Sequence, residues 1–178
     1  MRHHHLLIAL STTIIACNPP LEGDVIAVGD SIFDYNVEDE ASIPAVIGET
    51  LGLEVANAAI GGAQVMGGEN PIPDQYESGD WDWAVMDGGG NDLNDRCGCG
   101  DCGDVMDSLL SEDGTSGSIV DLVQQARSDG ARVAWVGYVD MPEDADFGFD
   151  RCGDELVEIR LRSAAMAEQD DGVIFVDA

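Results

Sequence analysis

The stretch Val25–Asn36, VIAVGDSIFDYN, runs from four apolar residues directly into a Gly-Asp-Ser turn. A short apolar run that is bounded by turn residues predicts a buried strand over Val25–Val28. Ser31 then lies just past the carboxyl end of that strand, which is where open parallel sheets bind their ligands. The stretch therefore predicts the first strand of an α/β sheet, and it raises the question of whether Ser31 is a catalytic nucleophile.

Similar apolar runs alternate with helical patterns along the rest of the chain. This alternation predicts a parallel sheet with helices on both faces. The expected strands are Val25–Val28, Glu54–Asn57, Trp83–Met86, Arg132–Gly137 and Val173–Val176. The expected helices are Ser42–Leu51, Val105–Leu110, Ser118–Ser128 and Asp154–Glu168.

Length and charge limit the kinds of protein that this sequence can encode. The chain has 178 residues, 44% of them hydrophobic, which is enough for one domain with a substantial core. It carries 36 Asp and Glu against 7 basic residues, a net charge of −29. Such a surface repels phosphate backbones, so we expect no nucleic-acid partner. We interpret the excess acid as a solvated outer face rather than as a specific cation site.

The N-terminal 17 residues are typical of an export signal. Arg2 and three histidines precede ten apolar or small residues, LLIALSTTII, a segment too short to span a membrane. The sequence IIAC that ends at Cys17 resembles a bacterial lipobox, in which the cysteine is acylated and becomes the mature N-terminus. An ordinary secretory peptide, or a partial histidine tag, are the alternatives.

We therefore divide the chain into a signal peptide at 1–17, a tether at 18–23 and a folded domain at 24–178. The domain is expected outside the cytoplasm, either lipid-anchored in a bacterial cell envelope or free in the periplasm or medium. Contact with a membrane is expected only through the lipid on Cys17. The oligomeric state is not predictable from the sequence.

Three short motifs follow three successive predicted strands and should meet at one edge of the sheet. They are Gly29–Ser31 after the first strand, NAAIGG at Asn57–Gly62 after the second, and GGGND at Gly88–Asp92 after the third. Each motif alone is a common glycine-rich turn. The three motifs together, in this order, are a much more specific signal than any one of them alone.

With these motifs the sequence resembles the GDSL or SGNH hydrolases, a family of serine esterases, lipases and related acyl hydrolases. The resemblance runs from about Val25 to Ala178, with Ile32 in place of the more common leucine. It implies that Ser31 is the nucleophile and that Gly62 and Asn91 belong to the oxyanion hole. It also implies a three-layer α/β/α sandwich with a five-stranded parallel sheet in the flavodoxin-like order 2-1-3-4-5.

Elementary chemistry agrees with these roles. Attack on an ester carbonyl creates an oxyanion, and each preorganised donor is worth about 3 to 4 kcal/mol to that intermediate. The backbone N–H groups of Ser31 and Gly62 and the side-chain amide of Asn91 can supply three donors. Such a site needs no cofactor and no metal. Asp30 and Asp92 we interpret as turn or hydrogen-bonding residues.

The general base is missing from these motifs. The family carries it in an Asp-x-x-His block after the final strand, whereas the only histidines of this sequence are His3, His4 and His5. We expect the sequence to be a fragment whose base lies beyond residue 178, and the fragment itself to turn over little or no substrate. The alternative is a catalytically inactive lipoprotein of the same fold that acts as a binding or structural module. The ester that is cleaved, whether small molecule, lipid or carbohydrate, is not identified by the sequence.

Four cysteines lie in the predicted domain, three of them in the cluster NDRCGCGDCGD. In an exported protein, Cys97, Cys99, Cys102 and Cys152 suggest two disulfides, with three possible pairings. The layout favours one bridge within the 97–102 loop and one from that loop to Cys152. A zinc site or free thiols are the alternatives.

Two further features are interpreted as structural. The tryptophans Trp81, Trp83 and Trp135 lie on or beside strands, so we expect them to pack in the core or at its rim. The acidic segment Asp140–Asp154 lacks the spacing of a calcium loop, and we expect a solvated surface loop there.

Overall fold

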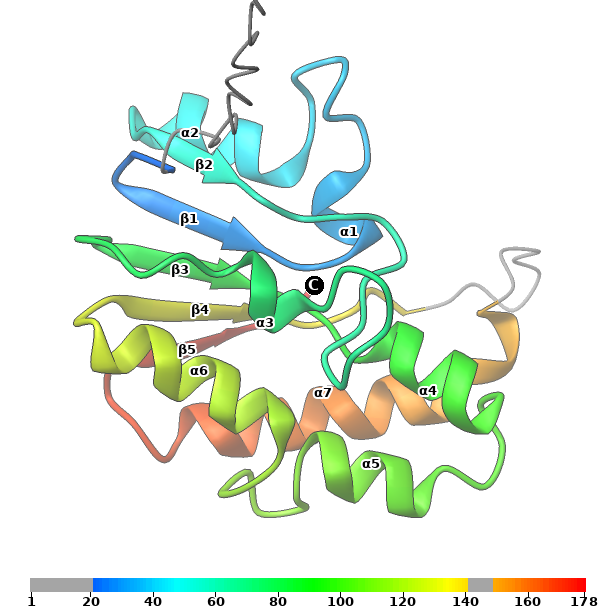
Figure 1. Ribbon diagram of the computed structural model, residues 1–178. Coiled ribbons are helices and arrows are strands. Elements are labelled where there is room, and N and C mark those ends of the chain that lie inside the picture. The colour runs from blue at the N-terminus through cyan, green and yellow to red at the C-terminus, as the bar shows by residue number, and fades with distance from the viewer. Residues whose placement is uncertain (1–20, 141–148) are drawn as a thin grey trace, which may run out of the picture.

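A computed structural model describes residues 21–140 and 149–178. Its centre is a five-stranded parallel sheet in the order β2-β1-β3-β4-β5, which confirms the predicted fold (Figure 1). The strands are β1 Val25–Val28, β2 Val55–Asn57, β3 Trp83–Met86, β4 Arg132–Val136 and β5 Val173–Val176. The signal peptide, Cys17, the three histidines and most of the tether lie outside the described residues.

The register of the sheet brings the ends of the strands into line. Val25 of β1 pairs with both Val55 of β2 and Trp83 of β3, and Trp83 pairs in turn with Arg132 of β4. All four strand pairs are parallel, so the five carboxyl ends share one edge of the sheet. The segments that follow β1, β2 and β3, where the three motifs lie, therefore start side by side.

Within the described residues, eight helical segments connect the strands. They are α1 Ser31–Asp34, α2 Ile43–Leu51, α3 Ile72–Gln75, α4 Gly90–Cys97, α5 Gly103–Leu109, α6 Ser118–Ser128, the 3-10 turn η1 Asp150–Cys152, and α7 Gly153–Ala167. The ends of α2 follow local chemistry, because the Ser42 hydroxyl accepts from Ala45 N at 3.3 Å and Gly52 closes the helix at φ 67°. The helices predicted at the positions of α2, α5, α6 and α7 are confirmed.

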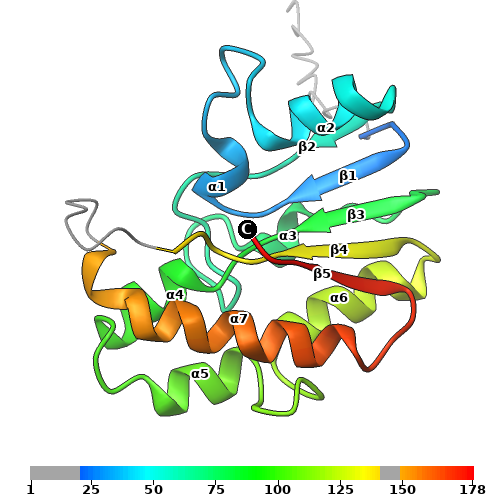
Figure 2. The same cartoon turned by 180° about the vertical axis from the view of Figure 1, so that it is seen from behind.

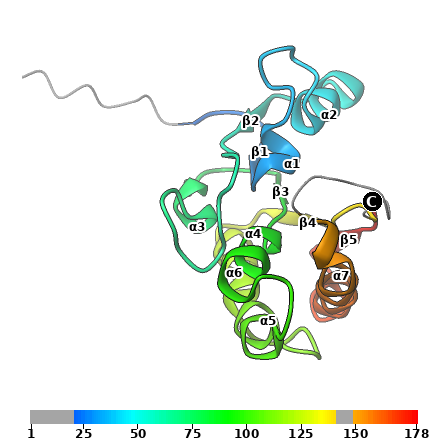
Figure 3. The same cartoon turned by 90° about the vertical axis from the view of Figure 1, so that its right-hand side faces the viewer.

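The helices divide unequally between the two faces of the sheet (Figures 2 and 3). Helices α1 and α2 lie against one face, where Phe33 packs with Val25, Ala27 and Val85. Helices α4 to α7 lie against the other face and form the larger core, which contains Ile26, Met86 and Trp135. On the α2 side, an apolar groove of about 500 Å³ runs between α2 and the exposed face of β3, β4 and β5.

Two helices were not predicted, and one predicted loop is partly helical. Helices α3 and α4 were not expected, and α4, like α1, begins inside a glycine motif. The segment Asp140–Asp154 was expected to be a loop, but η1 and the start of α7 occupy its last residues, while 141–148 lie outside the described residues. No helix of the described residues is long and apolar enough to cross a membrane.

The tryptophans pack as expected. Trp135 and Trp81 are buried. Trp83 is half-buried, and the guanidinium of Arg132 lies 4.2 Å from the centre of its ring.

Candidate active site

Ser31 is held in a tight turn between β1 and α1. It is exposed and is the first residue of α1. Asp30 caps this helix, because its Oδ1 accepts from Ile32 N at 3.0 Å. Gly29 has no room for a side chain, since a Cβ there would lie 1.7 Å from Asp87 Oδ1. The geometry of Gly-Asp-Ser thus presents the serine at the carboxyl edge of the sheet.

The segment after β2 runs alongside Ser31. Ile60 N donates to Gly29 O at 3.2 Å, and Gly61 N donates to Asp34 Oδ2 at 2.9 Å. A Cβ built at Gly61 would lie 4.0 Å from the Cβ of Ser31. Gly62 adopts φ 78°, a conformation that favours glycine, and a Cβ there would meet nothing within 4 Å. The space over Gly62 is therefore open to a ligand.

Asn91 joins the third motif to the other two. It lies in the first turn of α4, and its Nδ2 donates to Asp30 Oδ2 at 3.1 Å and to Ala63 O at 3.0 Å. One of these acceptors precedes Ser31 and the other follows Gly62. The structure therefore brings Ser31, Gly62 and Asn91 together, as the motifs predict.

Two backbone donors of this site have no acceptor among the described residues. They are Ser31 N and Gly62 N. The amide of Asn91, in contrast, uses its two N–H groups for Asp30 and Ala63. The arrangement thus offers two free backbone donors beside an amide that is already oriented.

Gln75, which lies outside the three motifs, forms two hydrogen bonds with the turn that carries Ser31. Its Oε1 accepts from Gly29 N at 2.8 Å, and its Nε2 donates to Gly29 O at 3.0 Å. The side chain is buried, and α3 places it there. A primary amide that accepts from a residue's N–H and donates to its carbonyl oxygen restrains that residue in the same way as a neighbouring β-strand does. Gln75 therefore fixes the position of the turn that carries Ser31.

A pair of buried carboxyl groups lies beneath the turn. Asp87 Oδ1 accepts from Asp30 N at 2.8 Å, and Asp87 Oδ2 has no hydrogen-bond partner among the described residues. Burial, and then the negative charge of Asp30, raise the pKa of Asp87 well above its ordinary value of 3.8. Burial also raises the pKa of Asp30, although the hydrogen bond from Tyr138 opposes that change. Asp30 accepts three hydrogen bonds, from Ile32, Asn91 and Tyr138, which favour its charged form, so the larger rise in pKa falls on Asp87.

The pair predicts an unusual pH dependence of stability. A carboxyl whose pKa is higher in the folded state stabilises the fold below its unfolded pKa, and this contribution is lost as the pH rises through the folded pKa. Asp87→Asn cannot ionise. Relative to wild type, its melting temperature is expected to gain about 2 °C or more between pH 5 and pH 8. Thermal melts followed by circular dichroism measure this difference.

The control for that measurement removes one carboxyl group from an exposed position instead of a buried one. Asp82 is exposed at the opposite end of β3, so Asp82→Asn should show no such gain. A difference between wild type and Asp87→Asn that does not change with pH would show that Asp87 ionises normally.

Asp92 anchors the segment that follows Gly62. It is fully buried, and its carboxylate accepts from Val65 N at 2.8 Å and from Met66 N at 2.9 Å. Burial raises the pKa of Asp92, while these N–H groups and Arg96 oppose the change. Asp30 and Asp92 are thus hydrogen-bonding residues, as the sequence predicted.

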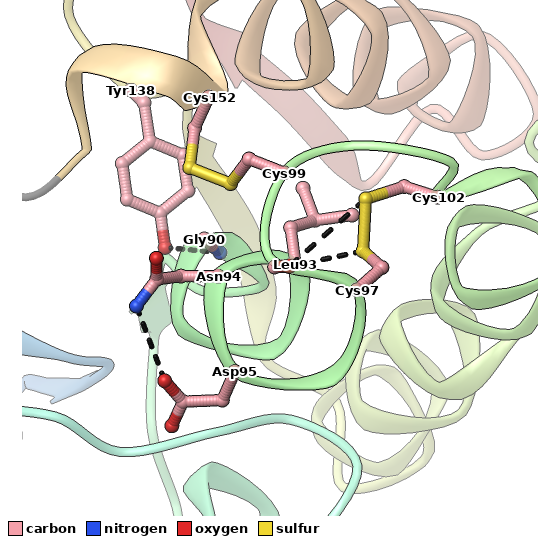
Figure 4. The surroundings of a disulfide bond; sticks show 9 residues. All are labelled: Gly90, Leu93, Asn94, Asp95, Cys97, Cys99, Cys102, Tyr138 and Cys152. Carbon is pink, nitrogen blue, oxygen red and sulfur yellow. Dashed lines mark hydrogen bonds between the residues drawn. A yellow bond between two sulfur atoms is a disulfide. The ribbon is translucent and has the colours of Figure 1, made fainter.

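The four cysteines of the described residues form two disulfides in the favoured pairing, Cys97–Cys102 and Cys99–Cys152 (Figure 4). The zinc and free-thiol alternatives are therefore wrong. Within residues 21–140 and 149–178, no group of three or more His, Cys, Asp and Glu side chains is placed to hold a metal ion.

Four residues that touch the site were not singled out from the sequence, namely Asp34, Gln75, Asp87 and Tyr138. Asp87 and Tyr138 follow strands at the carboxyl edge, so their position was a usable signal. Asp34 lies one turn after Ser31. Nothing in the sequence around Gln75 indicates its contact with Gly29.

One known protein family matches most of this chain. The sequence profile of the GDSL-like Lipase/Acylhydrolase family matches residues 27–178. The chain belongs to this family. In this GDSL-like chain, the motifs Gly29–Ser31, Asn57–Gly62 and Gly88–Asp92 lie together at the carboxyl edge of the sheet. A search of the curated proteins found no match.

Solved structures share the fold of this GDSL-like chain at low sequence identity. A protein from Streptococcus pneumonia superposes with a TM-score of 0.62 at 14% identity, over 92% of this chain and 68% of that one. TesA superposes with a TM-score of 0.58 at 20% identity, over 85% of this chain and 76% of its own. The acetyl xylan esterase AlAXEase gives 0.57 at 19% identity, over 86% and 76%.

Proposed function

We propose that this GDSL-like protein is a serine ester hydrolase in which Ser31 attacks the acyl carbon. The observation that carries the proposal is the pair of hydrogen bonds from Asn91 Nδ2 to Asp30 and Ala63, which joins the three motifs around Ser31. The family to which the chain belongs, and the esterase among its structural neighbours, support the same reaction class.

In the proposed reaction, a base removes the proton of the Ser31 hydroxyl as Oγ bonds to the ester carbonyl carbon. The carbonyl oxygen becomes an oxyanion, and the free N–H groups of Ser31 and Gly62 donate to it. Asn91 completes the oxyanion hole when one of its N–H groups turns from its present acceptor. The alcohol then leaves with a proton, and water releases the acid from the acyl-enzyme by the same route.

We place the base, as part of this proposal, in residues that follow Ala178. The described residues contain no histidine. Strand β5 ends at Val176 and is parallel to β1, so its carboxyl end opens at the same edge of the sheet as Ser31 (Figure 2). A histidine a short way past this point can reach the serine.

The experiment compares two polypeptides. One ends at Ala178, and the other continues with the residues that the downstream codons encode. We expect the longer one to hydrolyse p-nitrophenyl acetate or butyrate, and the 178-residue chain to stay at the background rate. If neither polypeptide cleaves any of a panel of acyl, acetyl-sugar and lysophospholipid esters, the protein is a binding module and the hydrolase assignment is wrong.

We also propose an extracytoplasmic location, with a lipid anchor on Cys17. The two disulfides support it, because such bonds persist in oxidising compartments. Metabolic labelling with a radioactive fatty acid, compared between wild type and Cys17→Ser, tests the anchor directly.

A further inference from the structure

Tyr138 connects two of the three motifs although it belongs to none of them. It lies two residues past the end of β4 and is buried. Its hydroxyl donates to Asp30 Oδ2 at 2.6 Å and accepts from Gly90 N at 2.9 Å. Asp30 precedes Ser31 and Gly90 precedes Asn91, so one hydroxyl bridges the residues just before the nucleophile and the oxyanion amide.

The bond to Gly90 holds the start of α4. The first N–H groups of a helix have no acceptor within the helix, and a buried one needs an acceptor from elsewhere. The Tyr138 hydroxyl supplies it at Gly90. The contact is close, because a Cβ at Gly90 would lie 2.8 Å from Tyr138 Cζ. Figure 4 shows the ring beside the Cys99–Cys152 disulfide, with its hydroxyl directed at the first turn of α4.

The bond to Asp30 acts on Asn91 through a shared oxygen. Asp30 Oδ2 accepts both from Tyr138 and from Asn91 Nδ2, at 2.6 and 3.1 Å. The position of this oxygen, together with that of Ala63 O, therefore sets the plane of the Asn91 amide. Loss of the hydroxyl leaves Gly90 N–H without its acceptor and removes the shortest bond to Asp30, and both of these residues are buried.

We infer that Tyr138 is a positioning residue, which keeps the Ser31 turn and the Asn91 amide in register for the reaction. This inference rests on the proposed ester hydrolysis. It assigns no chemical step to Tyr138, which contacts neither the serine side chain nor the amide directly in any described hydrogen bond.

The test removes only the hydroxyl. Tyr138→Phe keeps the ring, and Tyr76→Phe is the matched control, because Tyr76 is also buried and its hydroxyl bonds Asp129 at 3.1 Å, near the opposite edge of the sheet. In the longer polypeptide with p-nitrophenyl acetate, Tyr138→Phe is expected to lower kcat by about ten- to a hundredfold and to leave KM within about twofold. Tyr76→Phe should leave both constants within about twofold.

An unchanged kcat in Tyr138→Phe, or an equal fall in Tyr76→Phe, overturns the inference. If the wild type shows no hydrolysis that depends on Ser31, the proposed function is wrong. The positioning role of Tyr138 is then tested separately, by amide NMR of the 178-residue chain. In that case the Ser31 backbone amide and the Asn91 side-chain amide should shift in Tyr138→Phe and not in Tyr76→Phe. Resonances that stay in place in Tyr138→Phe reject it.

Discussion

Ser31→Ala is expected to abolish ester hydrolysis by the polypeptide that continues past Ala178, with a fall in kcat of about 10⁴-fold or more. In the proposed reaction the hydroxyl oxygen is the atom that bonds to the substrate, so no acyl-enzyme forms without it. The free N–H groups at Ser31 and Gly62 remain in the variant, and any residual rate reflects these donors and binding alone. Initial rates with p-nitrophenyl acetate and butyrate measure the loss.

The same variant should be as stable as the wild type. Ser31 is exposed, and its hydroxyl forms no hydrogen bond with another described residue. An exposed substitution without such a bond changes the free energy of unfolding by about 0.5 kcal/mol or less. If Ser31→Ala loses activity while its stability stays at the wild-type value, Ser31 has a chemical role and not a structural one.

A serine outside the site provides the control. Ser108 is exposed on α5, where its hydroxyl bonds Asp104 O at 2.8 Å. Ser108→Ala should keep the wild-type rate. Hydrolysis that persists in Ser31→Ala would show that another group is the nucleophile.

The sheet was predictable because its signals are local. Each strand is an apolar run of three to five residues between turn residues, and the observed ends differ from the predicted ones by at most one residue, as at Glu54 and Gly137. The order of the strands came from the resemblance and not from the runs themselves. The three motifs were predictable for the same reason, because each directly follows a strand.

The missed helices are held by contacts that are distant in sequence. Helix α4 starts in GGGND, which by composition is a turn. Its first backbone N–H, that of Gly90, donates to the Tyr138 hydroxyl. The carboxylate of Asp92, in its first turn, accepts from the backbone N–H groups of Val65 and Met66. Helix α3 is a single turn whose Gln75 pairs with Gly29, 46 residues away. No sequence pattern within α3 or α4 indicates these distant contacts.

The supporting shell of the site was missed for a related reason. Asp87 and Tyr138 are ordinary residue types, and they matter only because the fold brings their polar atoms to Asp30. The sequence pointed to Ser31, Gly62 and Asn91, whereas the groups that hold these residues in place became visible only with the structure.

Removal of the Cys99–Cys152 disulfide should have the largest effect on stability. The bridge closes a loop with a sequence separation of 53 residues, against 5 for Cys97–Cys102. Loop-closure entropy in the unfolded chain then gives about 4 kcal/mol for the long loop and about 2 kcal/mol for the short one. For a chain of this size the double variant Cys99→Ala/Cys152→Ala is expected to melt about 10 °C lower.

The second bridge is the internal control for this prediction. Cys97→Ala/Cys102→Ala removes the same number of sulfur atoms, so the two double variants differ chiefly in the length of chain that is released. Urea unfolding followed by circular dichroism gives both free energies. If the two losses are equal, chain entropy does not govern the effect.

The long bridge also bears on the site, because it joins the end of α4 to the start of α7. Cys99 and Cys152 are both buried, and Cys99 follows the helix that begins with Gly90 and Asn91. Tyr138 holds the first turn of α4 and the disulfide holds its far end. Below its melting temperature the Cys99→Ala/Cys152→Ala protein should therefore keep its KM and lose part of its kcat, whereas unchanged kinetics would show that the contacts of Tyr138 position α4 without the bridge.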